Sequence, residues 1–136
     1  MVPSPSKKGI MTKLTDPVML LASAIATQEG FFVATATIPK LRNNPGDLDY
    51  AGQIGATPSA VGSADPTLAV FGSLSLGIAA LYRQLWLQVA QGQTVREIIN
   101  QWDPGNPTYL SNVLEWTSLP ADTPVLELLP PLVKMN

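Results

Sequence analysis

Residues 18–32 read VMLLASAIATQEGFF, an apolar run that ends in one glutamate, one glycine and two phenylalanines. The apolar residues at positions 18, 21, 22 and 25 recur at the spacing of one helix face, and they predict a core helix over residues 16–29. Asp16, which precedes a proline, is typical of a helix start. Gly30 can end the helix by adopting a positive φ. Glu29 is therefore expected where the core helix stops, beside apolar side chains.

The composition predicts a single domain that is poor in charge. The chain has 136 residues, of which 46% are hydrophobic and 13% are charged. A soluble domain usually has about 25% charged residues, but the apolar fraction is ample for one core. The proline content and the periodicity predict a flexible N-terminal arm over residues 1–14, a domain over residues 15–130 and a C-terminal tail over residues 131–136.

The missing residue types exclude several chemistries. The chain has no cysteine and no histidine, so it can have no disulfide, no Cys/His zinc site and no histidine-based catalytic triad. Its lysines and arginines are scattered and its net charge is −2, which argues against a nucleic-acid partner. The acidic residues lack the spacing of a calcium loop. We therefore expect no metal and no cofactor.

The N-terminal region resembles a signal peptide but departs from its pattern. Lys7, Lys8 and Lys13 precede an apolar run with small residues, as in a basic region followed by a hydrophobic region. An Asp-Pro pair interrupts this pattern, and the apolar run is short. We therefore expect synthesis in the cytoplasm without a clear signal peptide. No run reaches the ~20 apolar residues of a membrane span.

The segment after the first helix has no helical period. Residues 33–71 are rich in proline and glycine, which predicts turns with room for short strands at residues 50–54 and 68–71. A second helix is expected over residues 75–91, with Ser73 as its cap. The expected apolar stripe of this helix consists of Leu74, Ile78, Leu81, Leu85 and Val89.

Three shorter helices are expected in the C-terminal third. Thr94 and Glu97 have the spacing of a capping box, which predicts a helix up to Trp102. Asn106 and its proline open another helix up to residue 118, and residues 122–129 read as a last short helix. Trp86 and Trp116 are expected in the core. The fold class predicted from these elements is α+β and mostly helical, with a small irregular or β insert after the first core helix.

Seven short motifs follow one another along residues 20–116: QEGF at 28–31, NNPGDL at 43–48, FGS at 71–73, GIAAL at 77–81, TVREII at 94–99, WDP at 102–104 and NPTYL at 106–110. Together they resemble the soluble lytic-transglycosylase-like and muramidase-like proteins of the lysozyme-like superfamily, which are often encoded by bacteriophages or prophages. The resemblance implies a lysozyme-like domain in which Glu29, at the end of the first core helix, is the general acid. It also implies that the NNPG turn lies on the opposite wall of a cleft. Members more often carry asparagine where this chain has Asp47.

Glu29 is the main candidate for a catalytic residue. A general acid that cleaves a glycosidic bond must be protonated near the working pH. The negative end of a helix and the apolar Phe31 and Phe32 would each raise the pKa of Glu29. The alternative is a glutamate that simply ends a helix at the surface.

Asp47 and Asp49 are candidates for a second carboxylate. A nucleophile would lie about 5 Å from the acid, and a base that activates water would lie roughly 6.5–9.5 Å away. The alternative is that both acids bond turn backbone. The resemblance implies a third route, in which the 6-hydroxyl of the substrate attacks and forms an anhydro sugar.

Four further residues are candidates for substrate binding. Asn43 and Asn44 can bond sugar hydroxyl or N-acetyl groups, or they can brace a turn. The rings of Tyr50 and Tyr109 can stack on a sugar face, although most aromatic residues at helical spacing belong to a core.

The function expected from the resemblance is cleavage of peptidoglycan between N-acetylmuramic acid and N-acetylglucosamine, at the bacterial cell wall or as part of a virion. The expected partners are a peptidoglycan glycan strand and virion or assembly proteins. One alternative is a structural or wall-binding protein without activity that retains a lysozyme-like fold. Another is a helical interaction module, in which Glu29 and Asn44 would lie far apart.

Overall fold

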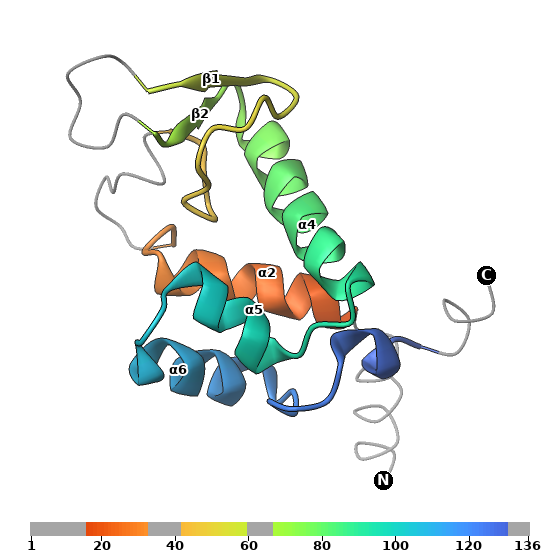
Figure 1. The fold of residues 1–136 in the computed structure, drawn as a ribbon. Helices are drawn as coiled ribbons and strands as arrows, with labels where there is room; N and C mark the ends of the chain where they lie inside the picture. Colours follow the sequence, from red (N-terminus) through yellow and green to blue (C-terminus); the bar gives the residue numbers. More distant parts are fainter. Residues whose placement is uncertain (1–15, 33–41, 60–66, 131–136) are drawn as a thin grey trace, which may run out of the picture.

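The computed structural model of the chain describes residues 16–32, 42–59 and 67–130. The predicted arm at 1–14 and tail at 131–136 lie outside these residues. In chain order the elements are the helix α2 (Pro17–Gln28), the strands β1 (Ala56–Pro58) and β2 (Ala69–Phe71), the helices α4 (Leu74–Ala90), α5 (Val95–Trp102) and α6 (Pro107–Thr117), and the 3-10 helix η1 (Val125–Leu128) (Figure 1). The predicted α+β, mostly helical class is confirmed.

Helix α2 is the centre of the fold. The Asp16 side chain accepts a hydrogen bond of 2.8 Å from the backbone N–H of Val18 and caps the first turn. At the other end Gly30 has a φ of 82°, and the N–H of Phe31 donates to Ala26 O at 2.9 Å. This is a Schellman ending, in which a left-handed glycine lets the chain satisfy the last helical carbonyls. It fixes Glu29 as the C-cap residue.

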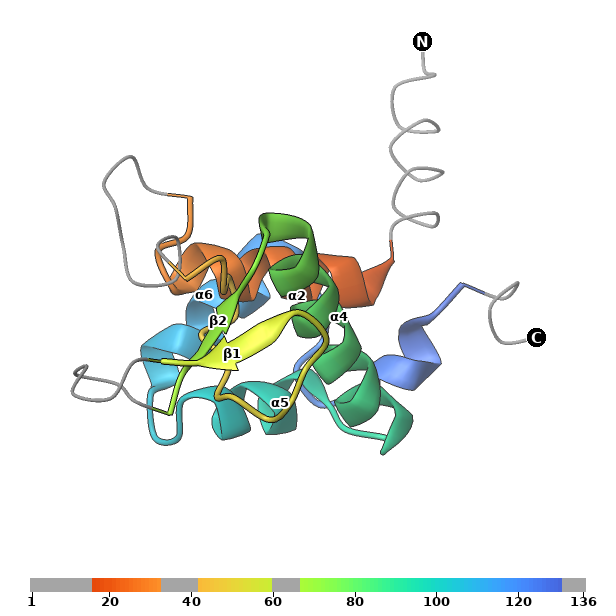
Figure 2. The same ribbon diagram turned by 90° about the horizontal axis from the view of Figure 1, so that it is seen from above.

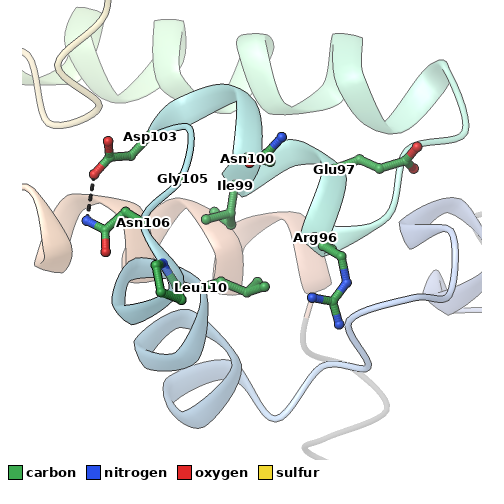
Figure 3. Close-up of a pocket in the computed structure, with 9 residues that line it drawn as sticks. Arg96, Glu97, Ile99, Asn100, Asp103, Gly105, Asn106 and Leu110 are labelled. Atoms are coloured by element: carbon green, nitrogen blue, oxygen red, sulfur yellow. Dashed lines mark hydrogen bonds between the residues drawn. The ribbon is translucent and has the colours of Figure 1, made fainter.

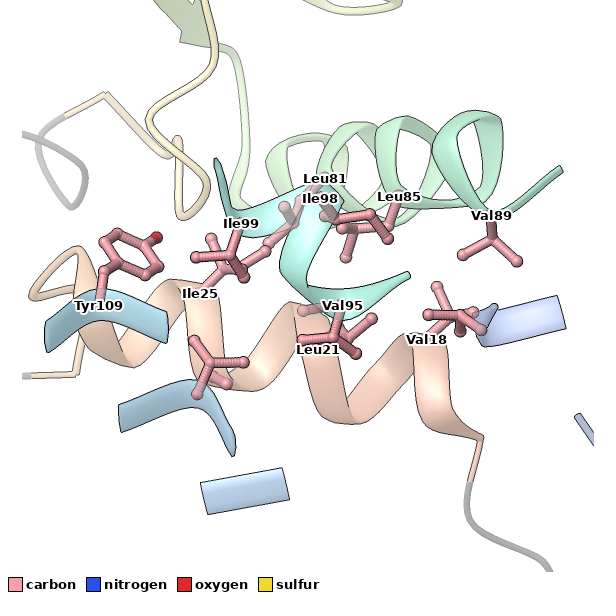
Figure 4. Packing of buried hydrophobic residues seen from close by; sticks show 14 of the residues in the cluster. Val18, Leu21, Ile25, Leu81, Leu85, Val89, Val95, Ile98, Ile99 and Tyr109 are labelled. Carbon is pink, nitrogen blue, oxygen red and sulfur yellow. The ribbon is translucent and has the colours of Figure 1, made fainter. Parts of the chain in front are cut away.

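The core lies where α2, α4 and α5 meet (Figure 4). Leu21 and Ile25 of α2 are fully buried, and so are Leu85 of α4 and Val95 and Ile98 of α5. Each such side chain contributes about 1.5–3 kcal/mol to folding by leaving water. Helix α2 also packs against α6. The apolar face predicted for residues 18–25 is therefore the face that holds the helices together.

The stripe predicted for α4 is correct in its C-terminal half and wrong in its N-terminal half. Leu81, Leu85 and Val89 are buried, whereas Leu74 and Ile78 are exposed. The reason is that the first turns of α4 lie beside the strands and away from α2, so none of the described helices covers that face (Figure 1). Ser73 caps this helix as predicted, by accepting a hydrogen bond from the N–H of Leu76.

The sheet has two short antiparallel strands, with Ala56 opposite Phe71 and Pro58 opposite Ala69. Seen from above, these strands project over the space between α2 and α5 (Figure 2). The second strand lies within residues 68–71, as predicted, but the strand predicted at 50–54 is wrong. The side chain of Gln53 instead closes a turn there by accepting from Ala51 N–H and donating to Asp49 O, both at 2.8 Å.

The C-terminal elements follow from their caps. The capping box between Thr94 and Glu97 is present, and the Asn106 side chain caps α6 by accepting from the N–H of Tyr109. The last short helix is a single stretch of 3-10 helix. Trp86 packs against the core, but the prediction for Trp116 is wrong because this residue is 47% exposed on α6. No helix in the described ranges is both long and apolar enough to cross a membrane.

Candidate functional site

Glu29 and Tyr109 form the centre of the candidate site. Glu29 ends α2, and Tyr109 lies in the first turn of α6, the helix that packs against α2. The Tyr109 hydroxyl donates a hydrogen bond of 2.9 Å to Glu29 Oε2. Tyr109 is only 2% exposed, so its ring belongs to the buried core. The residue predicted to contact a sugar therefore contacts the predicted acid instead.

The surroundings of Glu29 favour its protonated form. Burial raises the pKa of its carboxyl group above the usual value, and the negative charges of Asp47 and Asp103 raise this pKa further. The hydrogen bond from Tyr109 acts in the opposite direction and lowers this pKa. The direction predicted from the sequence is correct. Phe32 contributes little to this burial because it is 64% exposed.

The Tyr109 hydroxyl is a hydrogen-bond donor to Glu29 in this arrangement. Burial and the adjacent Glu29 raise the pKa of the Tyr109 phenol, which therefore keeps its proton. Its O–H thus fixes one carboxyl oxygen of Glu29 and leaves the other oxygen, Oε1, for a further partner.

Asp47 comes to this site from the loop after residue 42. It has a φ of 52°, and its N–H donates to Asn44 O at 3.1 Å. The indole N–H of Trp102 donates to Gly46 O at 2.9 Å and ties this loop to the end of α5. Because the charge of Asp47 acts on Glu29, the structure brings these two predicted carboxyl groups into one electrostatic environment.

Asp103 is a member of the site that the sequence analysis missed. It is the C-cap of α5, and its Oδ2 accepts a hydrogen bond of 2.7 Å from Asn106 Nδ2. Its charge raises the pKa of Glu29. The WDP motif at 102–104 contains Asp103, but in the sequence this motif supports only the resemblance and gives Asp103 no role of its own.

The two asparagines brace the loop. Asn44 is fully buried. Its Oδ1 accepts from Leu48 N–H at 2.9 Å, and its Nδ2 donates to Leu48 O at 2.9 Å and to Ala69 O at 3.0 Å. This amide has no surface left for a ligand, so the substrate-binding prediction for Asn44 is wrong. Asn43 is partly exposed and donates to Phe71 O at 3.1 Å.

Gly77 explains how the loop rests on α4. A Cβ atom at Gly77 would lie 1.7 Å from Asn43 O, far inside any permitted contact. A Cβ atom at Gly46 would lie 2.7 Å from the Leu81 side chain. The two glycines therefore let the loop backbone pack directly against α4. This contact positions the loop that carries Asp47.

Tyr50 and Asp49 lie further along the same loop. Tyr50 is exposed, and its N–H donates to Thr67 O at 2.7 Å beside the sheet. Asp49 Oδ1 accepts a hydrogen bond of 3.2 Å from the Thr67 hydroxyl. The partner is a side-chain hydroxyl 18 residues away and not turn backbone, so this bond does not match the alternative given for Asp49. Neither residue joins the pair formed by Glu29 and Tyr109.

Two cavities flank the acidic residues. One, of about 480 Å³, lies between α5 and α6 and includes Asp103, Asn106 and Leu110 (Figure 3). The other, of about 420 Å³, lies between the loop and helices α4 and α5 and includes Asp47 and Trp102. Glu29 lines neither of these two cavities.

The described part of the chain holds no group of three or more acidic side chains placed to bind a metal ion. The charges of Asp47 and Asp103 act on Glu29. This arrangement favours the protonated form of one carboxyl group, that of Glu29, beside the charges of two other acidic side chains.

Comparison with known proteins gives no relative. No protein-family model matches the chain, and no curated protein or solved structure matches it.

Proposed function

We propose that the chain is a peptidoglycan-cleaving glycosidase, a muramidase or lytic transglycosylase with a lysozyme-like fold, in which Glu29 is the general acid. The observation that carries this proposal is the setting of Glu29. Its carboxyl group is half-buried at a helix end and accepts a hydrogen bond from the Tyr109 hydroxyl, and its pKa is raised by burial and by the charges of Asp47 and Asp103. A protonated carboxylic acid near neutral pH is what glycosidic cleavage requires.

In the first chemical step, Glu29 is the residue that transfers a proton. Its carboxyl group gives its proton to the oxygen that leaves, the bond from C1 to that oxygen breaks, and the electron pair stays on the oxygen. Tyr109 then stabilises the new carboxylate, because a hydrogen bond to the ionised form lowers its energy. Positive charge develops on the sugar ring at the same time, and Asp47 is the carboxylate in the loop that can oppose it.

Two second steps are compatible with this first step. In hydrolysis, water adds to C1 and a carboxylate, Asp47 or Glu29, takes its proton. In transglycosylation, the 6-hydroxyl of the same sugar attacks C1, Glu29 takes back the proton, and a 1,6-anhydro sugar forms. Transglycosylation and hydrolysis with Glu29 as the base return a proton to Glu29. Hydrolysis with Asp47 as the base leaves the proton on Asp47, and exchange with solvent must then restore both carboxyl groups before the next turnover.

One observation favours a second candidate function. Glu29 lines neither of the two cavities described above, and the side-chain amide of Asn44 is hydrogen-bonded to backbone groups of Leu48 and Ala69. A phage or prophage structural protein, or a wall-binding protein, would keep such a fold without turnover. Its low charge suits an assembly partner.

The test is release of soluble fragments from purified peptidoglycan by wild type, Glu29→Gln and Glu115→Gln. Glu115 is exposed on α6, so its variant controls for loss of one carboxyl group. All three proteins must first give the same circular dichroism spectrum. Release by wild type and Glu115→Gln, with about a hundredfold or greater loss in Glu29→Gln, supports the proposal. No release by any folded protein favours the binding protein.

A further inference from the structure

A groove with negative charge lies between the loop at residues 46–53 and helices α4 and α5. It is the cavity of about 420 Å³, and the loop contributes two carboxylates to its lining, Asp47 and Asp49. No lysine or arginine is among the described residues that line it. A ligand in this groove therefore meets negative charge that no basic side chain of the lining offsets, which favours a cation and repels an anion.

The buried side of the groove has an unpaired hydrogen-bond acceptor. Gln88 of α4 lines the groove and is only 4% exposed. Its Nε2 donates a hydrogen bond of 2.7 Å to Gln101 Oε1, while its own Oε1 is buried and has no partner among the described residues. Since buried polar atoms are nearly always bonded, this oxygen marks a place where a ligand would supply a donor. Exchange of the amide atoms within the pair would leave Nε2 unpaired instead, and the uncharged probe described below distinguishes the two cases.

An aromatic ring is also part of the lining. Trp102 is the last residue of α5 and is half-buried beside the loop. Its indole N–H already donates to Gly46 O at 2.9 Å, so what Trp102 offers the groove is its ring. A tryptophan ring attracts an organic cation placed over its face, whereas it has no ligand atom for a metal ion.

The lining suits an organic cation better than a metal ion. Calcium takes about six to eight oxygen ligands, and strong sites supply several carboxylates. No cluster of three or more acidic side chains suited to a metal ion occurs in residues 16–32, 42–59 and 67–130. A primary ammonium group needs fewer partners, because it has one compact charge and three N–H donors. Two carboxylates, one amide oxygen and one aromatic ring match that requirement.

We infer that this groove binds the primary ammonium group of a peptide, that is, a lysine-type side chain. The ammonium group donates to Asp47, to Asp49 and to the amide oxygen of Gln88. The alkyl chain that carries it packs on the ring of Trp102. This inference goes beyond the proposed function, because cleavage of a glycan by Glu29 requires no cation. It gives the chain a second ligand, a basic peptide, which is held at the loop that carries Asp47.

The test is a titration of the ¹⁵N-labelled full chain with Nα-acetyl-lysine methylamide, followed by NMR. The side-chain amide signals of Gln88 and Gln101 and the indole signal of Trp102 are expected to shift with one dissociation constant. The matched probe is the same compound acetylated on Nε, which keeps the alkyl chain and loses the charge. It is expected to bind about tenfold more weakly, since hydrogen bonds to charged groups are stronger than neutral ones.

Substitutions assign the binding to the groove. Asp49→Asn keeps an oxygen for the Thr67 hydroxyl and removes one negative charge. It is expected to weaken binding of the lysine probe about threefold to tenfold, the usual effect of one weakened hydrogen bond. The matched control is Glu115→Gln, which removes the same charge from an exposed position on α6. This control is expected to leave the affinity unchanged.

Gln88→Met tests the buried oxygen and separates binding from folding. Methionine has a similar volume and removes the unpaired oxygen, so the thermal midpoint is expected to stay or rise, while affinity for the lysine probe falls. Because the variant also removes the partner of Gln101, its circular dichroism spectrum must match that of wild type before the titration.

Four results would overturn the inference. Three of them are absence of shifts at the groove with the lysine probe, equal binding of the charged and the acetylated probe, and equal affinity in wild type, Asp49→Asn and Gln88→Met. The fourth is calcium chloride that produces the same shifts at lower concentration than the lysine probe, because this would assign the groove to a metal ion. None of these titrations depends on cleavage, so the groove and the glycosidase proposal can each fail while the other stands.

Discussion

At the scale of single residues, the pair of Glu29 and Tyr109 makes a prediction about pH. The hydrogen bond from Tyr109 lowers the pKa of Glu29, so Tyr109→Phe raises this pKa. We expect the alkaline limb of the cleavage rate to move to higher pH, and the maximal rate to fall about tenfold because the acid is less well oriented.

The matched control for that change is Tyr82→Phe. The Tyr82 hydroxyl also donates to a carboxylate, that of Asp16, at the start of α2. Its loss should leave the pH profile in place. A profile that does not move in Tyr109→Phe, with both proteins folded, would mean that Tyr109 only supports the core.

Glu29 also makes a prediction about stability. Its pKa in the folded chain is raised above the ordinary value of 4.5. Well below pH 4.5 the carboxyl group is protonated in both the folded and the unfolded chain, so it does not lower the free energy of unfolding. As the pH rises, the unfolded chain ionises first, and stability falls until the folded pKa is passed. We expect Glu29→Gln to raise the thermal midpoint by a few degrees, roughly 2–4 °C, at pH 7.

The measurement is thermal unfolding of wild type and Glu29→Gln from pH 3.5 to pH 8. The advantage of the variant should shrink towards zero below pH 4.5. An advantage that is constant over this range, or a variant less stable at pH 7, would refute the raised pKa.

Asn44 shows what the sequence could not reveal at this scale. Its motif indicated either a sugar ligand or a turn brace, and only the contacts with Leu48 and Ala69 decide for the brace. We expect Asn44→Ala to lower the free energy of unfolding by about 2–4 kcal/mol, because buried backbone groups lose their partners. Urea denaturation measures this. Unchanged stability with lost sugar affinity would instead support a ligand role.

At the scale of elements, the helices and the strand within residues 68–71 were predictable, and the first strand and its pairing were not. Helix ends depend on local groups, namely the caps Asp16, Ser73, Thr94 and Asn106 and the glycine at position 30. Strand pairing joins residues far apart in the chain, such as Ala56 and Phe71, and the irregular segment gave no period to locate it. The strand expected at 50–54 was therefore displaced by a few residues.

The contact between α4 and the loop makes a prediction at this scale. A Cβ atom at Gly77 would collide with Asn43 O, so the loop must move in Gly77→Ala. We expect about 1–3 kcal/mol of lost stability from overpacking, and loss of cleavage because Asp47 is displaced. Urea denaturation and fragment release measure the two effects.

The control for Gly77→Ala is Ala79→Gly, which changes an exposed residue of the same helix. It costs about 1 kcal/mol through helix propensity without touching the loop. If both variants lose stability but keep full cleavage, the packing of the loop against α4 does not control the cleavage activity.

At the scale of the whole molecule, three distant segments meet at one carboxyl group. The end of α2 supplies Glu29, the loop supplies Asp47, and the α5–α6 corner supplies Asp103 and Tyr109. The sequence predicted Glu29 and Asp47 from their motifs. It did not predict that Tyr109 bonds Glu29 or that Asp103 acts on it, because the packing of α6 on α2 is a tertiary contact with no local signal.

The most direct measurement is mass spectrometry of peptidoglycan digested in H₂¹⁸O by wild type and by Glu29→Gln, both shown to be folded. The account predicts glycan fragments from wild type alone. Their new ends would carry ¹⁸O if water attacks, or would be unlabelled anhydro ends if the 6-hydroxyl attacks. Equal fragments from Glu29→Gln, or none from wild type on several wall types, would contradict the claim that Glu29 is the acid of a glycosidase.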